Sequence, residues 1–195
     1  MPPFLFYWSF LSLPLYHRLH LPHLLVLILL LISGVHPNPG PTPPLDPNFN
    51  VLQFNVNGLQ NSVAELSAFL IDNSIKVACL QETKLSARSK QPVFSGFNFI
   101  RRDRPVGGGG GLAILVHHSV PFTHIDASAV LNLDQSLELL AIRVEIGNSK
   151  LDIYNVYYPP VSLCPAGHHP DFPSLLAFPD NDALVLGDFN AHHQR

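Results

Sequence analysis

Cysteine is scarce in this sequence of 195 residues, which contains only Cys79 and Cys164. Two cysteines cannot form the dense disulfide framework that stabilises many small secreted domains. Cys79 lies in the apolar run at residues 77–80, which predicts a buried and unreactive thiol. The scarcity of cysteine therefore agrees with a reducing compartment and argues against a fold held together by disulfides.

Charged residues are also few, at 13% of the chain, and the formal net charge at pH 7 is −3. A protein with this balance has no global positive field that would draw it to nucleic acid. The charge is unevenly distributed, however: residues 76–104 contain seven basic and two acidic residues, whereas residues 105–195 contain three basic and nine acidic ones. Contact with a phosphate backbone is therefore expected in the basic stretch, whose alternative role is an ordinary solvated loop surface.

The sequence also lacks an uninterrupted apolar run of the ~20 residues that a membrane-spanning helix requires. Residues 4–16 and 24–33 are strongly apolar, but polar residues such as His17 and Arg18 separate them. Residues 24–32 have the length of a signal-peptide core. Two alternatives are therefore open: a signal peptide or membrane anchor at residues 4–33, with the membrane as a partner, or a nuclear or cytoplasmic protein.

Proline is abundant at the start of the chain. Residues 1–48 contain ten of the 19 prolines and only two charged residues, Arg18 and Asp46. Because proline has no backbone N–H and a fixed φ angle, residues 37–47 are predicted to form a linker rather than a helix or a central strand. The expected organisation is an apolar, proline-rich segment at residues 1–48 followed by a domain at residues 49–195.

The linker contains the sequence Asn-Pro-Gly-Pro at residues 38–41, directly after the leucine-rich run. This sequence resembles the ribosome-skipping peptides of the 2A type, which also occur near the start of some retrotransposon open reading frames. Gly34 and His36 stand where those peptides have acidic residues. The alternative is therefore that residues 38–41 act only as part of the linker.

Hydrophobic periodicity in residues 49–195 predicts many strands and few helices. The expected strands lie at residues 49–55, 75–80, 96–101, 112–117, 137–146, 150–157 and 183–186. Ser62 and Glu65 have the spacing of a capping box and predict a helix that ends at Asn73, and a short helix is expected at residues 174–178. Repeated strands with few helices predict a layered α/β protein with substantial antiparallel pairing.

Polar residues stand at the ends of three predicted strands. Asn55 ends the first, Glu82 follows the second, and Asp188 and Asn190 follow the last. Carboxylates are the hard oxygen ligands that divalent cations such as Mg²⁺ prefer, and amides can bind phosphate oxygens. Taken singly, each residue could equally hold a turn or cap a helix. Together they predict a phosphodiesterase site at one edge of a sheet, where binding sites on sheets collect.

Five segments in this order resemble the endonuclease/exonuclease/phosphatase family of metal-dependent phosphodiesterases. They are residues 54–59, 80–84, 101–105 with the glycine run 107–111, 155–160 and 186–192. Within the family, the Arg-Asp-Arg sequence, the glycine run and the Tyr-Tyr-Pro-Pro sequence resemble the N-terminal endonuclease domain of non-LTR (LINE-type) retrotransposon polyproteins. The resemblance implies an α/β fold in which a two-sheet β-sandwich is flanked by helices, in four layers α/β/β/α.

The resemblance also implies roles for individual residues. Glu82 would bind Mg²⁺ or Mn²⁺, with Asn55 beside it on the phosphate or in the outer shell of the metal. Asp188 would orient or deprotonate the attacking water, Asn190 would donate a hydrogen bond to the scissile phosphate, and Tyr157 would contact the same phosphate. For Tyr157 the alternative is an ordinary strand aromatic packed in the core.

Contact with DNA is implied as well, through the basic residues Lys84, Arg101, Arg102 and Arg104. In this class of element the nick leaves a 5′-phosphate and a free 3′-hydroxyl that primes reverse transcription. A fused reverse transcriptase and the element RNA are therefore the expected partners, besides DNA.

One family motif has no counterpart in the sequence. The family completes its site with a C-terminal histidine that is oriented by an acidic residue, whereas His192 and His193 are too close to Asp188 to take its place. We therefore expect the C-terminal part of the domain to be missing and the nicking activity of this chain to be weak or absent. The alternatives are a cellular family member that acts on abasic DNA or phospholipid headgroups, and a catalytically inactive remnant.

Overall fold

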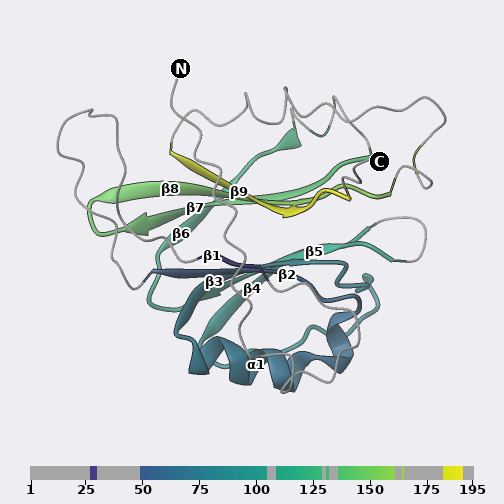
Figure 1. Cartoon of the computed structure of the whole chain (residues 1–195), viewed down its shortest axis with the longest axis horizontal. Helices are drawn as coiled ribbons and strands as arrows, with labels where there is room; N and C mark the ends of the chain where they lie inside the picture. Colours follow the sequence, from purple (N-terminus) through teal and green to yellow (C-terminus); the bar gives the residue numbers. More distant parts are fainter. Residues whose placement is uncertain are drawn as a thin grey trace, which may run out of the picture.

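The computed structural model contains two β-sheets stacked face to face, with a helix on the outer face of one of them (Figure 1). It describes residues 27–29, 49–104, 109–128, 131, 136–160, 164 and 182–190. In chain order the elements are β1 (Leu27–Leu29), β2 (Asn50–Asn55), the 3₁₀ turn η2 (Leu59–Asn61), α1 (Val63–Asp72), β3 (Ile75–Gln81), β4 (Phe97–Arg102), β5 (Leu112–His117), β6 (Phe122–Ile125), β7 (Glu138–Ile146), β8 (Ser149–Tyr157) and β9 (Ala183–Asp188). The linker, the Asn-Pro-Gly-Pro sequence and the short helix expected at residues 174–178 lie outside the described residues.

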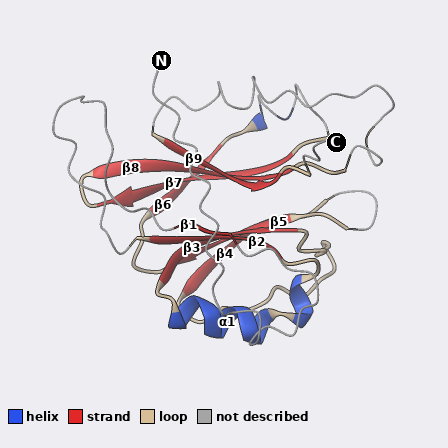
Figure 2. Cartoon of the chain, viewed as in Figure 1, coloured by secondary structure: helices blue, strands red, loops and turns tan. Residues whose placement is uncertain are grey.

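The first sheet has the strand order β1-β2-β3-β5-β4, and α1 lies against it (Figure 2). β2 and β3 are parallel, as expected for two strands joined through a helix, and the other pairs are antiparallel. α1 presents Leu66, Phe69 and Leu70 to the sheet at helical spacing, which buries all three. The predicted strand–helix–strand start is therefore confirmed.

The predicted capping box at the start of α1 is wrong. Ser62 occupies the N-cap position, but its side chain makes no capping hydrogen bond. The turn η2 ends directly before it, and the Ser62 N–H donates to the carbonyl of Leu59 at 3.0 Å. This turn holds Ser62 at φ −110° and ψ 4°, outside the extended conformation that a capping side chain requires. The predicted helix end is correct, because Asn73 is the C-cap and its Nδ2 donates to Phe69 O at 2.9 Å.

The second sheet has the strand order β6-β7-β8-β9. β7 and β8 form the predicted hairpin around Gly147 and Asn148, and β9 is parallel to β8. Two described strands were not expected from the sequence. β6 is a short, half-exposed edge strand with no clear alternation, and β1 is a three-residue strand inside the apolar run, paired with β2.

Apolar residues fill the space between the two sheets and the space between the first sheet and α1. Val77, Cys79 and Ile114 of the first sheet pack with Ile142 and Ile153 of the second. Cys79 is fully buried there, as predicted, and burial raises the pKa of its thiol. Cys79 is therefore a packing residue rather than a reactive one.

A chain of buried amides crosses the space between the sheets. Gln53 Nε2 donates to Gln81 Oε1, and Gln81 Nε2 donates to Asn155 Oδ1, both at 2.6 Å. Asn155 Nδ2 in turn donates to Leu80 O at 3.0 Å and to Ala113 O at 2.9 Å. Asn155 belongs to β8, and the other four residues belong to the first sheet. These bonds therefore fix the alignment of one sheet on the other.

The two-sheet sandwich with a helical outer layer confirms the predicted fold class. Within the described ranges, no helix has the length and apolar character needed to span a membrane.

Candidate active site

Three strand ends meet at one edge of the sandwich. Asn55 ends β2, Glu82 directly follows β3, and Asp188 ends β9 of the other sheet. Asn55 Nδ2 donates hydrogen bonds to Glu82 Oε1 and to Asp188 Oδ2, each 2.8 Å long. The structure thus brings together these three residues named from the sequence, with one amide bridging two carboxylates.

The backbone around this cluster has unusual dihedral angles. Asn57, Glu82, Lys84 and Asn190 have φ angles of 44°, 51°, 52° and 44°. Non-glycine residues rarely adopt this left-handed conformation, which costs on the order of 1–3 kcal/mol for each residue. Among the described non-glycine residues, the fifth with positive φ is Ser74, which follows α1. Backbone strain is therefore concentrated in the segments that carry the polar side chains.

Lys84 lies beside the carboxylates. Its Nζ is 3.8 Å from Glu82 Oε2 and donates a hydrogen bond to Asn57 Oδ1. The Lys84 side chain is 42% exposed, so its charge remains accessible to an anion from solvent. Asn57 lies in the recognised segment at residues 54–59 but was not named as a site residue, and its contribution here is to hold the lysine.

Tyr157 belongs to a row of residues across the second sheet. Its register partners are Glu138 on β7 and Asp188 on β9, so the three side chains lie on one face of the sheet. Tyr157 is only 4% exposed. Burial is the main reason that the pKa of its phenol is raised to about 12; the Glu82 and Asp188 carboxylates act in the same direction, and Arg104 opposes them. The phenol therefore keeps its proton at neutral pH and can donate a hydrogen bond to an anionic oxygen.

Asn190 closes the turn after β9. Its backbone N–H donates to Asp188 Oδ1 at 3.1 Å, and its side-chain Nδ2 donates to Tyr158 O at 2.7 Å. The first bond holds Asp188 Oδ1, the carboxylate oxygen that Asn55 does not contact, and the second ties the turn to the residue after β8. The role of Asn190 as a phosphate ligand remains a prediction.

Arg101 and Arg102, expected on DNA, are both used within the fold. Arg101 donates to the carbonyls of Ser86 and Ser89, at 3.2 and 3.4 Å. Arg102 Nη1 donates to Leu139 O at 3.0 Å and so connects β4 of one sheet to β7 of the other. Contact of these two guanidinium groups with DNA remains a prediction.

Residues 52–195 match the sequence model of the endonuclease/exonuclease/phosphatase family. The chain belongs to this family. The match spans Asn55, Glu82, Tyr157 and Asp188, the residues that meet at the candidate site. Comparison with curated proteins finds no match.

Solved structures with the same fold are those of nucleases and related proteins. The endonuclease domain of TRAS1, a telomere-specific non-LTR retrotransposon, has a TM-score of 0.51 and 17% identity over 74% of this chain and 60% of that chain. A family protein from Leptotrichia buccalis C-1013-b has a TM-score of 0.51 and 11% identity over 73% and 66%. D. rerio TDP2, complexed with a single-strand DNA product, has a TM-score of 0.50 and 18% identity over 74% and 62%. The chain thus spans less than two thirds of the length of these structures, and the likeness establishes the fold.

Nucleases of the endonuclease/exonuclease/phosphatase family generally use divalent metal ions, and the chemistry of the cluster fits Mg²⁺. This ion binds through one or two carboxylates and keeps several of its waters. Glu82 offers a carboxylate that is 22% exposed. Asn55 Oδ1 accepts the Asn57 N–H at 3.0 Å, so this amide is arranged to orient the carboxylates rather than to bind an ion itself. Within the described ranges, no group of three or more His, Cys, Asp and Glu side chains could hold a metal, so the fit rests on Glu82 with Asn55 behind it.

The end of the glycine run supports the turn that carries Glu82. The Thr83 N–H donates to Gly111 O at 3.0 Å, and the Lys84 N–H donates to Gly110 O at 2.9 Å. Gly111 has a φ angle of +84°, and a Cβ atom there would lie 2.8 Å from Thr83 Oγ1. The last two residues of the glycine run are thus hydrogen-bonded to the segment that carries the site.

We expect Gly111→Ala to lower the free energy of unfolding by about 1–3 kcal/mol, because it adds a steric overlap to an unfavourable φ angle. Urea unfolding followed by circular dichroism measures this loss. Gly147→Ala is the matched control, since Gly147 also has positive φ (+60°) but no atom within 4 Å of an added Cβ. A loss in Gly111→Ala no larger than in Gly147→Ala would contradict the overlap with Thr83.

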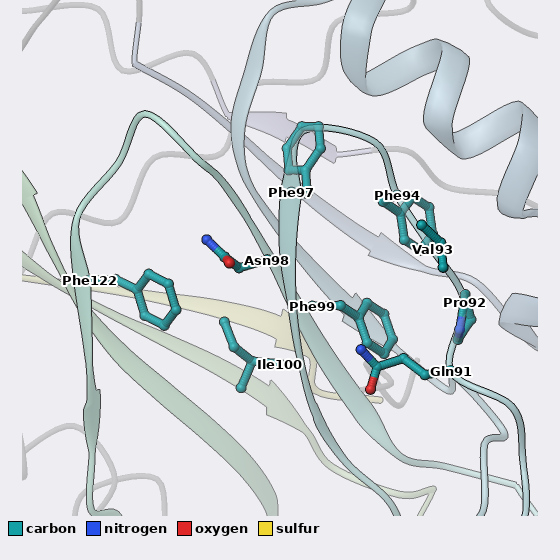
Figure 3. A pocket seen from close by; sticks show the side chains of 9 residues that line it. All are labelled: Gln91, Pro92, Val93, Phe94, Phe97, Asn98, Phe99, Ile100 and Phe122. Atoms are coloured by element: carbon teal, nitrogen blue, oxygen red, sulfur yellow. The ribbon is translucent and has the colours of Figure 1, made fainter.

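A cavity of about 420 Å³ lies on another side of the molecule (Figure 3). It opens beside β4 and β6, each of which is one of the two edge strands of its sheet. Its lining residues are Gln91, Pro92, Val93, Phe94, Phe97, Asn98, Phe99, Ile100 and Phe122. None of the predicted site residues lines it, so this cavity is separate from the candidate active site.

Sequence reasoning missed the residues that support the site. Asn155 and Gln81 lie in the recognised motifs, but nothing in their spacing indicated a bond between the two sheets. Glu138 had a usable signal: a two-residue turn at Gly147 and Asn148 fixes the hairpin register, which brings Glu138 opposite Tyr157. The contact of Glu138 with Arg104, between the two sheets, had no such signal.

Proposed function

We propose that the chain is part of a metal-dependent phosphodiesterase that nicks DNA, of the kind encoded by non-LTR retrotransposons. The observation that carries the proposal is the pair of carboxylates, Glu82 and Asp188, bridged by the Asn55 amide. One carboxylate can hold a hard cation while the other orients water, as phosphodiester hydrolysis requires. The retrotransposon assignment is supported by the sequences at residues 101–105, 107–111 and 157–160.

In the proposed reaction, a water attacks phosphorus in line with the P–O3′ bond. Asp188 orients this water and accepts its proton, while the P–O3′ bond breaks and the 3′-oxygen leaves as an alkoxide that takes a proton from solvent water. The buried phenol of Tyr157 and the amide of Asn190 donate hydrogen bonds to the phosphate oxygens. Glu82 would hold Mg²⁺, which when bound would supply positive charge to stabilise the pentavalent transition state. Lys84 and Arg104 contribute cationic groups at the same edge of the sandwich.

The remaining assignments follow from this function. We propose that residues 49–195 form the nuclease part and residues 1–48 an appended apolar segment with a linker. In the intact element the partners are DNA, the element RNA and a fused reverse transcriptase, which uses the 3′-hydroxyl as its primer. A nuclear or cytoplasmic location follows from a DNA substrate.

The test is a single-turnover nicking assay in which the full chain is in excess over supercoiled plasmid. With Mg²⁺ we expect slow conversion to the open circle, and the new 3′ ends are expected to be extended by a DNA polymerase. Removal of the metal with EDTA is expected to abolish nicking, and Mn²⁺ or Mg²⁺ to restore it.

Parallel arms distinguish the alternative substrates. An oligonucleotide with one abasic site tests the preference of a repair enzyme, and vesicles that contain phosphoinositide test a lipid substrate. Faster turnover in either arm than on plasmid would replace the retrotransposon assignment. Binding of DNA without turnover in any arm would identify a catalytically inactive remnant.

A further inference from the structure

Glu138 is a largely buried carboxylate to which the proposed reaction gives no role. Its side chain is 14% exposed at the first position of β7. Oε1 accepts a hydrogen bond from Arg104 Nε at 2.5 Å and also pairs with Arg104 Nη2. Oε2 accepts the Gly111 backbone N–H at 2.7 Å. Both oxygens of this carboxylate are therefore engaged, each with a different segment of the chain.

The first of these segments places a guanidinium group over the predicted phosphate-contacting tyrosine. Arg104 Cζ lies 5.5 Å from the centre of the Tyr157 ring. Glu138 is directly opposite Tyr157 in the β7–β8 pair, so both side chains lie on one face of the sheet. Two nitrogens of the Arg104 guanidinium, Nε and Nη2, contact the same carboxylate oxygen, Glu138 Oε1, and these charge-assisted contacts restrain the position of the group. Glu138 therefore determines where Arg104 stacks on Tyr157.

The second segment connects Glu138 to the carboxylate on the other sheet. Gly111, whose N–H binds Glu138, accepts through its carbonyl the N–H of Thr83 at 3.0 Å. Thr83 directly follows Glu82 and is 1% exposed. One side chain thus restrains both the tyrosine of the second sheet and the turn that carries Glu82 on the first.

We propose that Glu138 is a positioning residue of the active site, which holds Arg104 on Tyr157 and the glycine segment behind Glu82. Arg104, named from the sequence as a DNA contact, acts in this arrangement through Tyr157. The proposal rests on the proposed function for its consequence in catalysis, but the arrangement itself can be tested without turnover.

The test uses the full chain with 3-fluorotyrosine at its five tyrosines and ¹⁹F NMR as the readout. Tyr157→Phe assigns the Tyr157 resonance. Glu138→Gln keeps the shape of the side chain but removes the negative charge that holds the Arg104 guanidinium. We therefore expect this variant to shift the Tyr157 resonance. Arg104→Ala, which removes the guanidinium, is expected to shift it as well. Glu145→Gln is the matched control, because Glu145 is an exposed carboxylate on the same strand.

Circular dichroism is used to check whether each variant is folded. If Glu138→Gln does not fold, Arg104→Ala provides the test in its place. A Tyr157 resonance that moves no further in a folded variant than in Glu145→Gln would overturn the proposal. If the wild-type chain nicks DNA, Glu138→Gln is expected to lower kcat by about tenfold or more with a smaller change in KM. The reason is that Tyr157 would no longer be held in position to contact the phosphate. If the wild-type chain does not nick DNA, the proposed function fails and the NMR shift still decides the role of Glu138.

Discussion

Asp188→Asn is expected to lower the single-turnover rate of Mg²⁺-dependent plasmid nicking by roughly 10²–10⁴-fold, the usual contribution of a general base. Asparagine keeps the shape of the side chain and can still accept the Asn190 N–H, which lies 3.1 Å from Oδ1. What it loses is the negative charge that accepts the proton of the attacking water in the proposed reaction, and its Nδ2 takes the place of Oδ2, the acceptor of the 2.8 Å bond from Asn55. We therefore expect Asp188→Asn to fold but to nick plasmid much more slowly than the wild-type chain.

Asp182→Asn is the matched control for this variant, because Asp182 is an exposed carboxylate immediately before the same strand, β9. It is expected to nick plasmid at the wild-type rate. DNA binding, measured by fluorescence anisotropy, should change little in either variant. An Asp188→Asn protein that nicks as fast as Asp182→Asn would remove Asp188 from the reaction.

Asn155→Leu is expected to cause the largest loss of stability, about 3 kcal/mol or more, because it leaves several buried polar groups without partners. Leucine has a similar volume, so the loss comes from hydrogen bonding rather than from a cavity. The carbonyls of Leu80 and Ala113 would lose their bonds from Asn155 Nδ2, and Gln81 Nε2 would lose its bond to Oδ1. Urea unfolding, extrapolated to water, measures the change.

Asn98→Leu is the comparison for this loss, since Asn98 is exposed on β4. Surface substitutions of this kind usually change stability by less than about 0.5 kcal/mol. Equal losses in the two variants would mean that the amide chain between the sheets contributes no more than an exposed residue does. A larger loss in Asn155→Leu would also be expected to slow nicking, because the sheets carry separate parts of the site.

The sequence predicted the strands that carry the chemistry because each has a local signal. The apolar runs before Asn55 and Glu82 are buried strands, the run before Asp188 is a partly buried one, and the polar residue that ends each run marks the edge of a sheet. The helix after β2 and the β7–β8 hairpin were also visible, from helical spacing and from a Gly-Asn turn. These features depend on neighbours within a few residues along the chain.

Other features depend on contacts that no local pattern encodes. The capping box failed because the turn η2 holds Ser62 in a conformation that its own sequence does not require. The edge strand β6 has little alternation, because Phe122 and Ile125 pack against apolar clusters on opposite faces of the sheet, so its pairing with β7 determines it. Glu138 and Arg104 meet because two sheets pack together, and their separation of 34 residues gives no periodic signal.

The bridge from Asn55 to Asp188 joins residues that are 133 positions apart. During synthesis, β2, α1 and β3 can form early from neighbouring parts of the chain, whereas β9 is made last among the described strands and must close the longest loop. The second carboxylate therefore reaches the first only when folding is nearly complete. An unfinished copy of the chain therefore lacks the bridge between Asn55 and Asp188, and the candidate site assembles only when the second sheet closes on the first.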